Sequence, residues 1–326
     1  MRKPNVLLSM LSVLALLRVG PSFAAPDYPS GPITIVVPYG AGGPSDVLTR
    51  IVAERMRIVF GQRVVIENVT GAAGRIGTAR AARMPPDGYT LVQGGAATHV
   101  VHPAMHKLSY DVFADFEAVS LLAETTFMVV GRKNLPANNL RELISWLKAK
   151  AEPATQGTTG VGSTSHLAGI LLQKQTGTRL DFVPYRSTPM TGLVAGEIDL
   201  LIDQVSNALP QVRSGTIKPF VVAASRRLTA APDIPSTAQA GLPNFQVSNW
   251  VALFAPKGTP KDITSKINGA VGASLADPIV RARLAELAWE IPSPDQLGPE
   301  AFAKFHRAEI ERWWPIIKDA GIQADD

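Results

Sequence analysis

A buried strand, a glycine-rich turn and a helix follow one another near the start of the sequence, and this order constrains the fold most. Residues Ile33–Val37 form a continuous β-branched run, which is typical of a strand buried on both faces. The turn Gly40–Gly43 follows, and apolar residues then recur at helical spacing from Val47 to Val59. This succession predicts the first unit of a parallel α/β sheet.

The alternation continues along the chain for about 300 residues, which is more than one compact layer usually holds. It predicts an α/β protein with mainly parallel sheets. No low-complexity linker separates two halves, so we expect two lobes between which the chain crosses more than once. Pro260, Pro278 and Pro299 are expected to begin the last three helices. Further strands are expected at Val64–Ile66, Tyr89–Gln93, Phe127–Val130, Leu180–Val183, Ile198–Ile202, Phe220–Ala223 and Trp250–Phe254, and a loop is expected at Gly157–Gly162.

Residues 1–24 have the order of a secretion signal. Arg2 and Lys3 precede the apolar run Val6–Leu17, which is too short to span a bilayer, and Ser22 to Ala24 supply the small residues of a cleavage site. The alternative is an uncleaved anchor. The segment predicts a mature protein that begins near Ala25 and is exported.

The charge and the absence of cysteine exclude several classes. The full chain has 32 basic and 27 acidic residues, a net charge of +5. Removal of Arg2, Lys3 and Arg18 with the signal leaves 29 basic residues, so the net charge falls to +2 and the case for a nucleic-acid partner disappears. With no cysteine, disulfides, thiolate metal sites and a cysteine nucleophile are excluded.

Enzyme and cofactor motifs are weak. The sequence contains no G-x-S-x-G, H-E-x-x-H or Walker motif, and two glycine turns each miss the third glycine of a dinucleotide fingerprint. His99, His102 and His106 have the spacing of one helical face, but Pro103 interrupts it, which favours ordinary histidines over a metal site. Ser165 and His166 are adjacent on one helical turn, which does not favour a catalytic pair. We therefore expect no catalysis, cofactor or metal.

Two small-residue loops are better candidates for function. The loops Pro38–Asp46 and Gly160–His166 each lead from a strand into a helix, where backbone N–H groups and the helix dipole favour an anion such as a carboxylate. The alternative is that glycine and serine only shape turns and cap helices. Other residues follow strands at the edge where open α/β sheets bind ligands: Ala97, Thr98, Tyr185, Arg186 and Asp203. Trp250 is expected either to line a cleft or to lie in the core.

Several segments together resemble one family. The chain is similar, over essentially its whole mature length, to the Bug family, the periplasmic solute receptors of tripartite tricarboxylate transporters. The segments that carry the resemblance are Ile33–Asp46, Glu67–Asn68, Gly71–Gly74, Pro86–Leu91, Gly160–Gly169, Val183–Arg186, Ala208–Pro210, Ala240–Pro243 and Ala255–Pro260. The sequence departs from the family pattern at Arg186–Gly192, which is one or two residues shorter and is expected to border the cleft.

The resemblance implies a type II periplasmic-binding-protein fold and a function without catalysis. Lobe 1 would comprise residues 25–125 and 246–326, and lobe 2 residues 126–245. A monomer would hold a small carboxylate between the lobes and deliver it to integral-membrane transporter subunits. The alternatives are an exported α/β hydrolase-like enzyme and a ligand-sensing partner of a membrane kinase. The residues that the resemblance implies as ligand contacts are Tyr39, Ala41, Gly42, Gly43, Asp46, Ala97, Thr98, Gly162, Ser163, Thr164, Ser165, Tyr185, Arg186 and Asp203.

Overall fold

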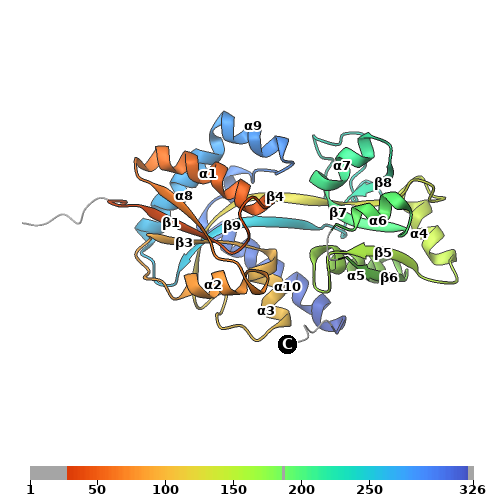
Figure 1. Ribbon diagram of the computed structural model, residues 1–326, viewed down its shortest axis with the longest axis horizontal. Coiled ribbons are helices and arrows are strands. Elements are labelled where there is room, and N and C mark those ends of the chain that lie inside the picture. Colours follow the sequence, from red (N-terminus) through yellow and green to blue (C-terminus); the bar gives the residue numbers. More distant parts are fainter. Residues whose placement is uncertain (1–27, 186–187, 322–326) are drawn as a thin grey trace, which may run out of the picture.

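The protein has two α/β lobes joined by crossing strands (Figure 1). The structure is a computed structural model that describes residues 28–185 and 188–321. The predicted signal segment and Arg186 lie outside the described residues. Within the described ranges, no helix is long and apolar enough to cross a membrane.

Lobe 1 is a sheet covered by helices on both faces. Its strand order is β2-β1-β3-β9-β4. α1, α8 and α9 pack against one face through a core that includes Ile33, Leu48 and Ile267, and α2 and α10 cover the other face. A short π-helical turn, η2 (Ala97–Val101), follows β3. The elements are β1 (Ile33–Val37), α1 (Pro44–Phe60), β2 (Val64–Asn68), α2 (Arg75–Ala82), β3 (Thr90–Gly95), α3 (His102–Met105), β4 (Phe116–Arg132), β9 (Ser248–Pro256), α8 (Lys261–Ala276), α9 (Pro278–Glu286) and α10 (Pro299–Asp319).

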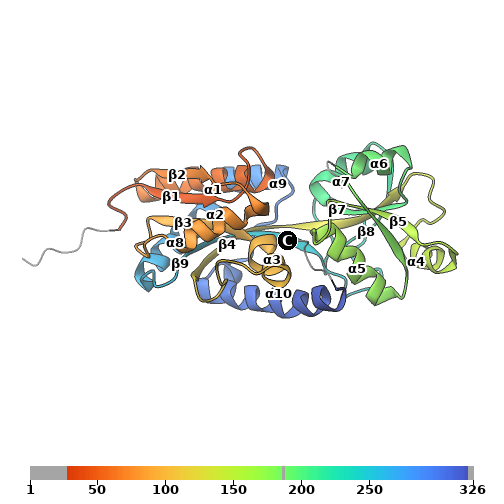
Figure 2. The ribbon, with the colours of Figure 1, turned by 60° about the horizontal axis from the view of Figure 1, so that its bottom comes forward.

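Lobe 2 has the same layered design around the second part of β4. Its strand order is β8-β4-β7-β5-β6, and α6 and α7 pack on the face opposite to α4 and α5. Figure 2 shows α10 extending from lobe 1 beneath α5, where Lys174 Nζ lies 2.8 Å from Asp319 Oδ2. The elements are α4 (Leu140–Ala149), β5 (Ala154–Thr158), α5 (Thr164–Thr176), β6 (Leu180–Pro184), α6 (Met190–Ala195), β7 (Leu200–Gln204), α7 (Val205–Arg213) and β8 (Ile217–Val222).

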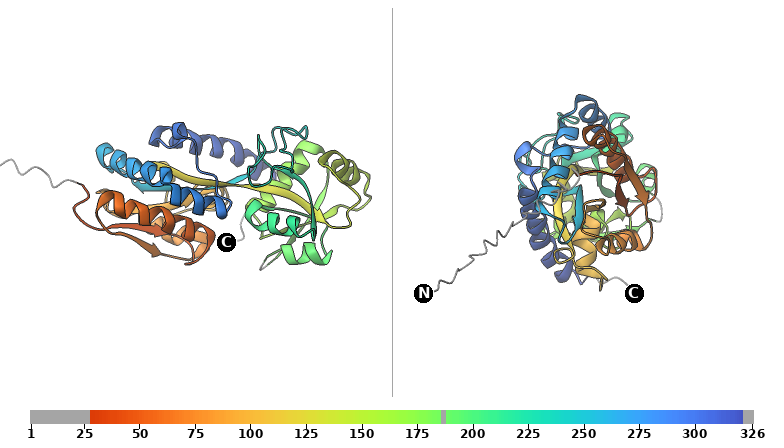
Figure 3. Two further views of the ribbon diagram at one scale, coloured as in Figure 1. Left: turned by 90° about the horizontal axis from the view of Figure 1, so that it is seen from above. Right: turned by 90° about the vertical axis from the view of Figure 1, so that its left-hand side faces the viewer.

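The strand β4 belongs to both lobes. Its residues 116–126 pair antiparallel with β9, whereas residues 127–132 pair with β7 and β8. Figure 3 shows β4 running from one lobe into the other. The change of partner lies beside the predicted lobe boundary, and the division into 25–125 with 246–326 and 126–245 stays a prediction.

Three expectations about the strands were incomplete or wrong. β4 begins at Phe116, eleven residues before the predicted strand, because its first part is a long strand that crosses to lobe 2. β5 includes Gly157 and Thr158, which were expected in a loop. The sheet is mixed rather than mainly parallel, since β9 and β4 run antiparallel to their neighbours where the chain crosses between lobes. The last three helices begin at or directly after the predicted prolines.

Candidate functional site

The loop after β1 is held by the first turn of the helix that it enters. Gly43 is the N-cap of α1 and offers no side chain for capping, while its own N–H donates to Gly40 O at 3.3 Å. Gly42 has φ +80°, a left-handed conformation that suits glycine. Its N–H donates to Asp46 Oδ2 at 2.8 Å. As at any helix start, other amides of the first turn of α1 have no intrahelical carbonyl partner.

Asp46 is the anchor of this loop. Its side chain is 0% exposed and accepts hydrogen bonds from Arg50 Nε and Asn68 Nδ2, both at 2.8 Å, besides that from Gly42. Asn68 Nδ2 also donates to Tyr39 O at 2.9 Å. Burial alone would raise the pKa of Asp46, but the donors and the nearby guanidinium outweigh it and lower the pKa. Asp46 is therefore ionised at neutral pH, and its three donors all come from the protein.

The loop after β5 repeats this geometry in lobe 2. Ser163 N–H donates to Gly160 O at 3.2 Å, and Gly162, with φ +75°, donates its N–H to His166 Nδ1 at 3.1 Å. Burial lowers the pKa of His166, so its ring is neutral and Nδ1 can accept. The N-cap Ser163 accepts from His166 N–H through its hydroxyl oxygen, 3.3 Å away. The backbone angles of the two N-caps agree closely, with φ −69° and ψ 162° at Gly43 and φ −66° and ψ 157° at Ser163.

A cavity of about 330 Å³ joins the two helix starts. Lobe 2 contributes Thr164, the first residue of α5, and Gln204, at the end of β7. No charged or imidazole side chain is found among its described lining residues. Neutral amides and hydroxyls therefore have to recognise whatever occupies it. The full lining is Tyr39, Gly43, Pro44, Ser45, Gln93, Gly95, Ala96, Ala97, Thr164, Gln204, Asn249, Trp250 and Trp289.

The predicted contacts fall into three groups. Tyr39, Gly43, Ala97 and Thr164 line the cavity. A second group belongs to the same loops or supports the lining without itself lining the cavity: Ala41, Gly42, Asp46, Thr98, Gly162, Ser163 and Ser165. Tyr185 and Asp203 form the third group and lie outside the lining.

Thr98 illustrates the second group. It is buried, and its side chain forms a hydrogen bond with the Tyr39 hydroxyl. Tyr110 Oη donates a hydrogen bond to the Thr98 carbonyl at 2.9 Å. Burial raises the pKa of Tyr39 to about 12, so the phenol stays protonated and available as a donor. Thr98 thus orients a side chain that lines the cavity.

Tyr185 and Asp203 have other partners. A Cβ added to Gly192 would lie 2.0 Å from the Tyr185 hydroxyl oxygen, so the ring lies against α6. Asp203 Oδ1 accepts from Gln204 N–H at 2.8 Å and from Asn207 Nδ2 at 3.4 Å, at the start of α7. Burial raises the pKa of Asp203. It is the neighbouring Gln204 that reaches the cavity.

Sequence reasoning missed the neutral side chains that complete the lining. Gln93 and Gln204 lie at the carboxyl ends of strands, so a search of those ends for polar residues could have found them. Asn249 lies on an antiparallel crossing strand and Trp289 follows α9, and neither position carries such a signal. Trp250 was expected either to line a cleft or to lie in the core, and it does both. Its side chain is 0% exposed, packs against Phe302 in the core and borders the cavity.

The other catalytic and metal candidates have structural partners. Ser165 Oγ lies 3.0 Å from Ser163 Oγ and accepts from Thr159 N–H at 3.3 Å, whereas His166 Nδ1 accepts from Gly162. His99 is fully buried and stacked on Phe254. Over residues 28–185 and 188–321, no group of three histidine, aspartate or glutamate side chains could hold a metal ion.

Comparison with known proteins identifies the family. The model of the tripartite tricarboxylate transporter family receptor matches residues 48–322. The chain belongs to this receptor family. Receptors of the family are periplasmic solute-binding proteins, and the Bug resemblance is confirmed, since BugT of Bordetella pertussis is 31% identical over 96% of this chain and 98% of its own. An Agrobacterium vitis protein encoded in the TAR-I ttuE-ttuC′ intergenic region is 39% identical over 91% of this chain and 87% of its own.

Solved structures confirm the periplasmic-binding-protein fold of the receptor. MatC from Rhodopseudomonas palustris with bound malate is 37% identical, with a TM-score of 0.74 over 89% of this chain and 100% of that chain. A second R. palustris protein, solved with adipate, is 31% identical, with a TM-score of 0.76 over 91% of this chain and 99% of that chain.

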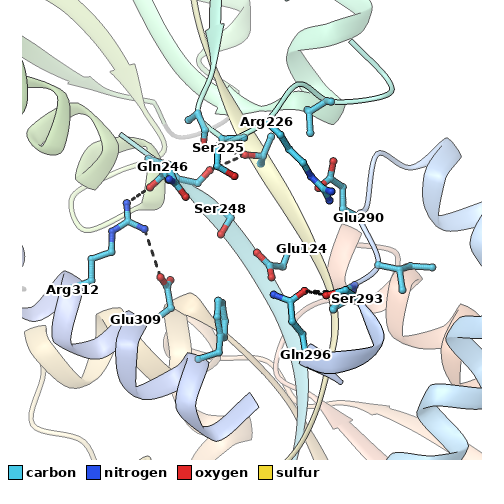
Figure 4. Close-up of a pocket in the computed structure, with 18 of the residues that line it drawn as sticks. Glu124, Ser225, Arg226, Gln246, Ser248, Glu290, Ser293, Gln296, Glu309 and Arg312 are labelled. Atoms are coloured by element: carbon cyan, nitrogen blue, oxygen red, sulfur yellow. Dashed lines mark hydrogen bonds and ion pairs between the residues drawn. The ribbon is translucent and has the colours of Figure 1, made fainter. Parts of the chain in front are cut away.

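The receptor has a second cavity of about 640 Å³ between the lobes, beside the crossing strands (Figure 4). Glu124 on β4 and Ser248 on β9 line it, together with Arg226 of lobe 2 and Glu309 of α10. The pKa of Glu124 is raised to about 7, mainly because the side chain is buried and to a lesser extent because the carboxylates of Glu309 and Glu290 are nearby. Because its walls come from both lobes, the cavity has to change shape when the lobes move relative to each other.

Proposed function

We propose that the receptor captures a small carboxylate in the 330 Å³ cavity and delivers it to the membrane subunits of its transporter. The observation that carries this proposal is the pairing of two helix starts, of α1 and α5, at one neutral cavity. First-turn amides and the positive ends of two helix dipoles favour negative charge from both sides.

The volume and the lining support a small anionic ligand. Ligand sites commonly enclose 300–1,000 Å³, so this cavity is at the small end. Tyr39, Ser45 and Thr164 add hydroxyl groups, and Gln93, Gln204 and Asn249 add amides. The malate and the adipate named in the two R. palustris structures belong to the same class of ligand.

Residues at the site have different roles under this proposal. The direct contacts are the lining residues and the exposed amide of Ala41, whereas Gly42 holds Asp46, and Asp46 and Thr98 position Tyr39 and the first loop. Arg186 keeps its place as a proposed contact on the family resemblance alone. The proposed set is Tyr39, Ala41, Gly42, Gly43, Asp46, Ala97, Thr98, Gly162, Ser163, Thr164, Ser165, Tyr185, Arg186 and Asp203.

The receptor is proposed to act without catalysis. The described lining of the cavity offers hydroxyl groups but no carboxylate or imidazole beside them that could serve as a general base. Binding energy would instead favour a closed arrangement in which both lobes touch the ligand. We further propose a periplasmic monomer that loses residues 1–24 as a signal peptide.

A thermal-shift screen with matched ligands tests the proposal. We expect a dicarboxylate such as succinate, malate or adipate to raise the melting temperature, and the corresponding diamide to leave it unchanged, because only the carboxylate is favoured by the helix dipoles. Titration calorimetry then gives the affinity of the best ligand. If phosphate esters or sugars raise the melting temperature and no carboxylate does, the proposal is wrong.

A further inference from the structure

A basic groove lies on lobe 1, outside the solute cavity. It has a volume of about 600 Å³ and runs between α2 and the segment Lys107–Tyr110 that follows α3. Figure 2 shows α2 and α3 on the surface of lobe 1, with α3 on the side of lobe 2. The described residues that line the groove are Ala72, Arg75, Ile76, Ala79, Arg80, Arg83, Met84, Lys107, Leu108, Ser109 and Tyr110.

Four cations and no acidic residue are found among these described lining residues. Arg75 and Arg80 lie on α2, Arg83 is the C-cap of this helix, and Lys107 lies on the opposite wall. Arg80 is paired with Glu67, with Nη1 and Oε1 2.7 Å apart. Arg83 and Lys107 are exposed, and their side chains have no ion pair within the described ranges. The groove therefore presents uncompensated positive charge.

Apolar groups lie between these cations. Ile76 is 54% exposed, although it is a large aliphatic side chain on a short helix. Ala79, Met84 and Leu108 continue the apolar surface along the groove. An exposed apolar strip with a charged rim is typical of a surface that binds another protein.

The groove is linked to the solute cavity through Tyr110. The ring of Tyr110 lines the groove, while its hydroxyl donates to Thr98 O, and the Thr98 side chain bonds with Tyr39 in the cavity lining. Gly74, directly before α2, also lies against this pair, since an added Cβ would be 2.9 Å from Thr98 Cγ2 and 3.2 Å from the Tyr39 ring. A partner in the groove would contact the wall behind the solute site.

We propose that this groove docks an acidic protein segment of the transporter's membrane subunits, with an apolar side chain of the segment against Ile76 and Leu108. The proposal rests on the proposed function for the identity of the partner. Charge complementarity selects an acidic segment. The exposed apolar strip between the cations favours a protein segment with an apolar side chain over the charged headgroups of a lipid bilayer.

Reversal of two charges tests the proposal. The double variant Arg83→Glu/Lys107→Glu is compared with wild type in a flotation assay, with proteoliposomes that carry the membrane subunits. We expect its affinity for the proteoliposomes to fall at least about tenfold, in line with the loss of close charge pairs at an interface. Raising the NaCl concentration from 50 to 300 mM should weaken wild-type binding more than that of the variant.

The matched control makes the same change of charge elsewhere. Arg141→Glu/Lys148→Glu alters two exposed residues of α4, at the far end of lobe 2, and should bind the proteoliposomes like wild type. Both double variants should keep the wild-type melting temperature, and their solute affinity should stay within about twofold of wild type. If Arg83→Glu/Lys107→Glu unfolds, Arg83→Ala/Lys107→Ala takes its place.

Three outcomes would overturn the docking proposal. In the first, Arg83→Glu/Lys107→Glu binds the proteoliposomes as tightly as wild type does. In the second, wild type does not bind the proteoliposomes. In the third, wild type binds vesicles of phosphatidylglycerol alone as tightly as the proteoliposomes, which would assign the groove to lipid. Each is distinct from a failure of the proposed function, in which no carboxylate would raise the melting temperature.

Discussion

Asp46 and His166 hold the two loops of the solute site in place, each by accepting a hydrogen bond from the glycine four residues before it. They do so with different chemistry. Asp46 accepts from Gly42 N–H as a carboxylate, whereas His166 accepts from Gly162 N–H as a neutral ring. A buried carboxylate near a site for anions would repel the ligand if it were uncompensated. Arg50 and Asn68 provide that compensation in lobe 1, so both loops can favour an anion.

The substitution Asp46→Asn tests the first of these anchors. It removes the ion pair with Arg50 and places an amide among three donors, so we expect the free energy of unfolding to fall by about 2 kcal/mol at pH 7. Urea unfolding measures the change. Glu54→Gln, which breaks the exposed Arg57 pair on the same helix, should change stability little. Equal effects of the two substitutions would contradict the role of Asp46.

The pKa of Asp46 adds a pH dependence to this prediction. Because its folded-state pKa lies below the ordinary value of 3.8, the carboxylate stabilises the fold above that pH, and the contribution is lost as the pH falls through the lowered pKa. Asp46→Asn should therefore approach wild type in stability in strong acid.

Glu124 should show the opposite dependence on pH. Its folded-state pKa is raised from 4.5 to about 7, so the native protein keeps a proton that the unfolded chain releases. Stability must then decrease as the pH rises from about 4.5 to 7. Glu124→Gln should flatten this decrease and raise the free energy of unfolding at pH 8 by on the order of 2 kcal/mol. Urea titrations at pH 5 and pH 8 measure it, and a parallel pH dependence in wild type and variant would refute the assignment.

At the scale of elements, the N-terminus of α5 is both a structural cap and a proposed ligand contact. Ser163 Oγ accepts from His166 N–H and donates to Gly160 O at 2.7 Å. Asn139 caps α4 in a comparable way, accepting from Glu142 N–H at 2.9 Å, but α4 lies at the far end of lobe 2. The two caps allow the structural and the binding contributions to be separated.

The matched pair Ser163→Ala and Asn139→Ala uses this difference. Each should lower the free energy of unfolding by about 1 kcal/mol, the typical cost of a lost N-cap. Only Ser163→Ala should also weaken the binding of the carboxylate found in the thermal-shift screen, about tenfold by calorimetry. Equal solute affinity of the two variants would remove Ser163 from the site.

The sequence predicts elements well where local patterns and tertiary burial agree. The β-branched run of β1 and the periodic face of α1 mark both elements, and the loop between them was predicted as part of the site. β5 was missed because its sequence, ATQGT, is polar and contains glycine, although the strand is largely buried between β6 and β7. Likewise, Asn249 reaches the cavity on the crossing strand β9, and Trp289 reaches it from the segment that follows α9. No local sequence pattern records either position.

At the scale of the whole molecule, the two lobes approach closely beside the cavity. Gly162 in the β5–α5 loop of lobe 2 faces Met105 at the end of α3 in lobe 1, and a Cβ added to Gly162 would lie 2.5 Å from Met105 Cε. An added Cβ would therefore have to displace Met105 Cε, and this costs little because the atom is the far end of a flexible side chain. Gly177, after α5, has a similar φ of +67° but nothing within 4 Å of an added Cβ.

Gly162→Ala should therefore push the Met105 side chain aside and leave the lobes able to close. Both Gly162→Ala and Gly177→Ala impose a left-handed alanine, which costs about 1–2 kcal/mol of stability. Only the first places a methyl group against the opposite lobe. Because Met105 can move aside, the two variants should differ little in solute affinity, and small-angle scattering with saturating carboxylate should give the radius of gyration of wild type for both. The second change Met105→Ala removes the atoms that have to move and should leave the affinity of the Gly162→Ala variant unchanged. A loss of affinity in Gly162→Ala that Met105→Ala restores would contradict this expectation, because the methyl group and Met105 would then hold the lobes apart.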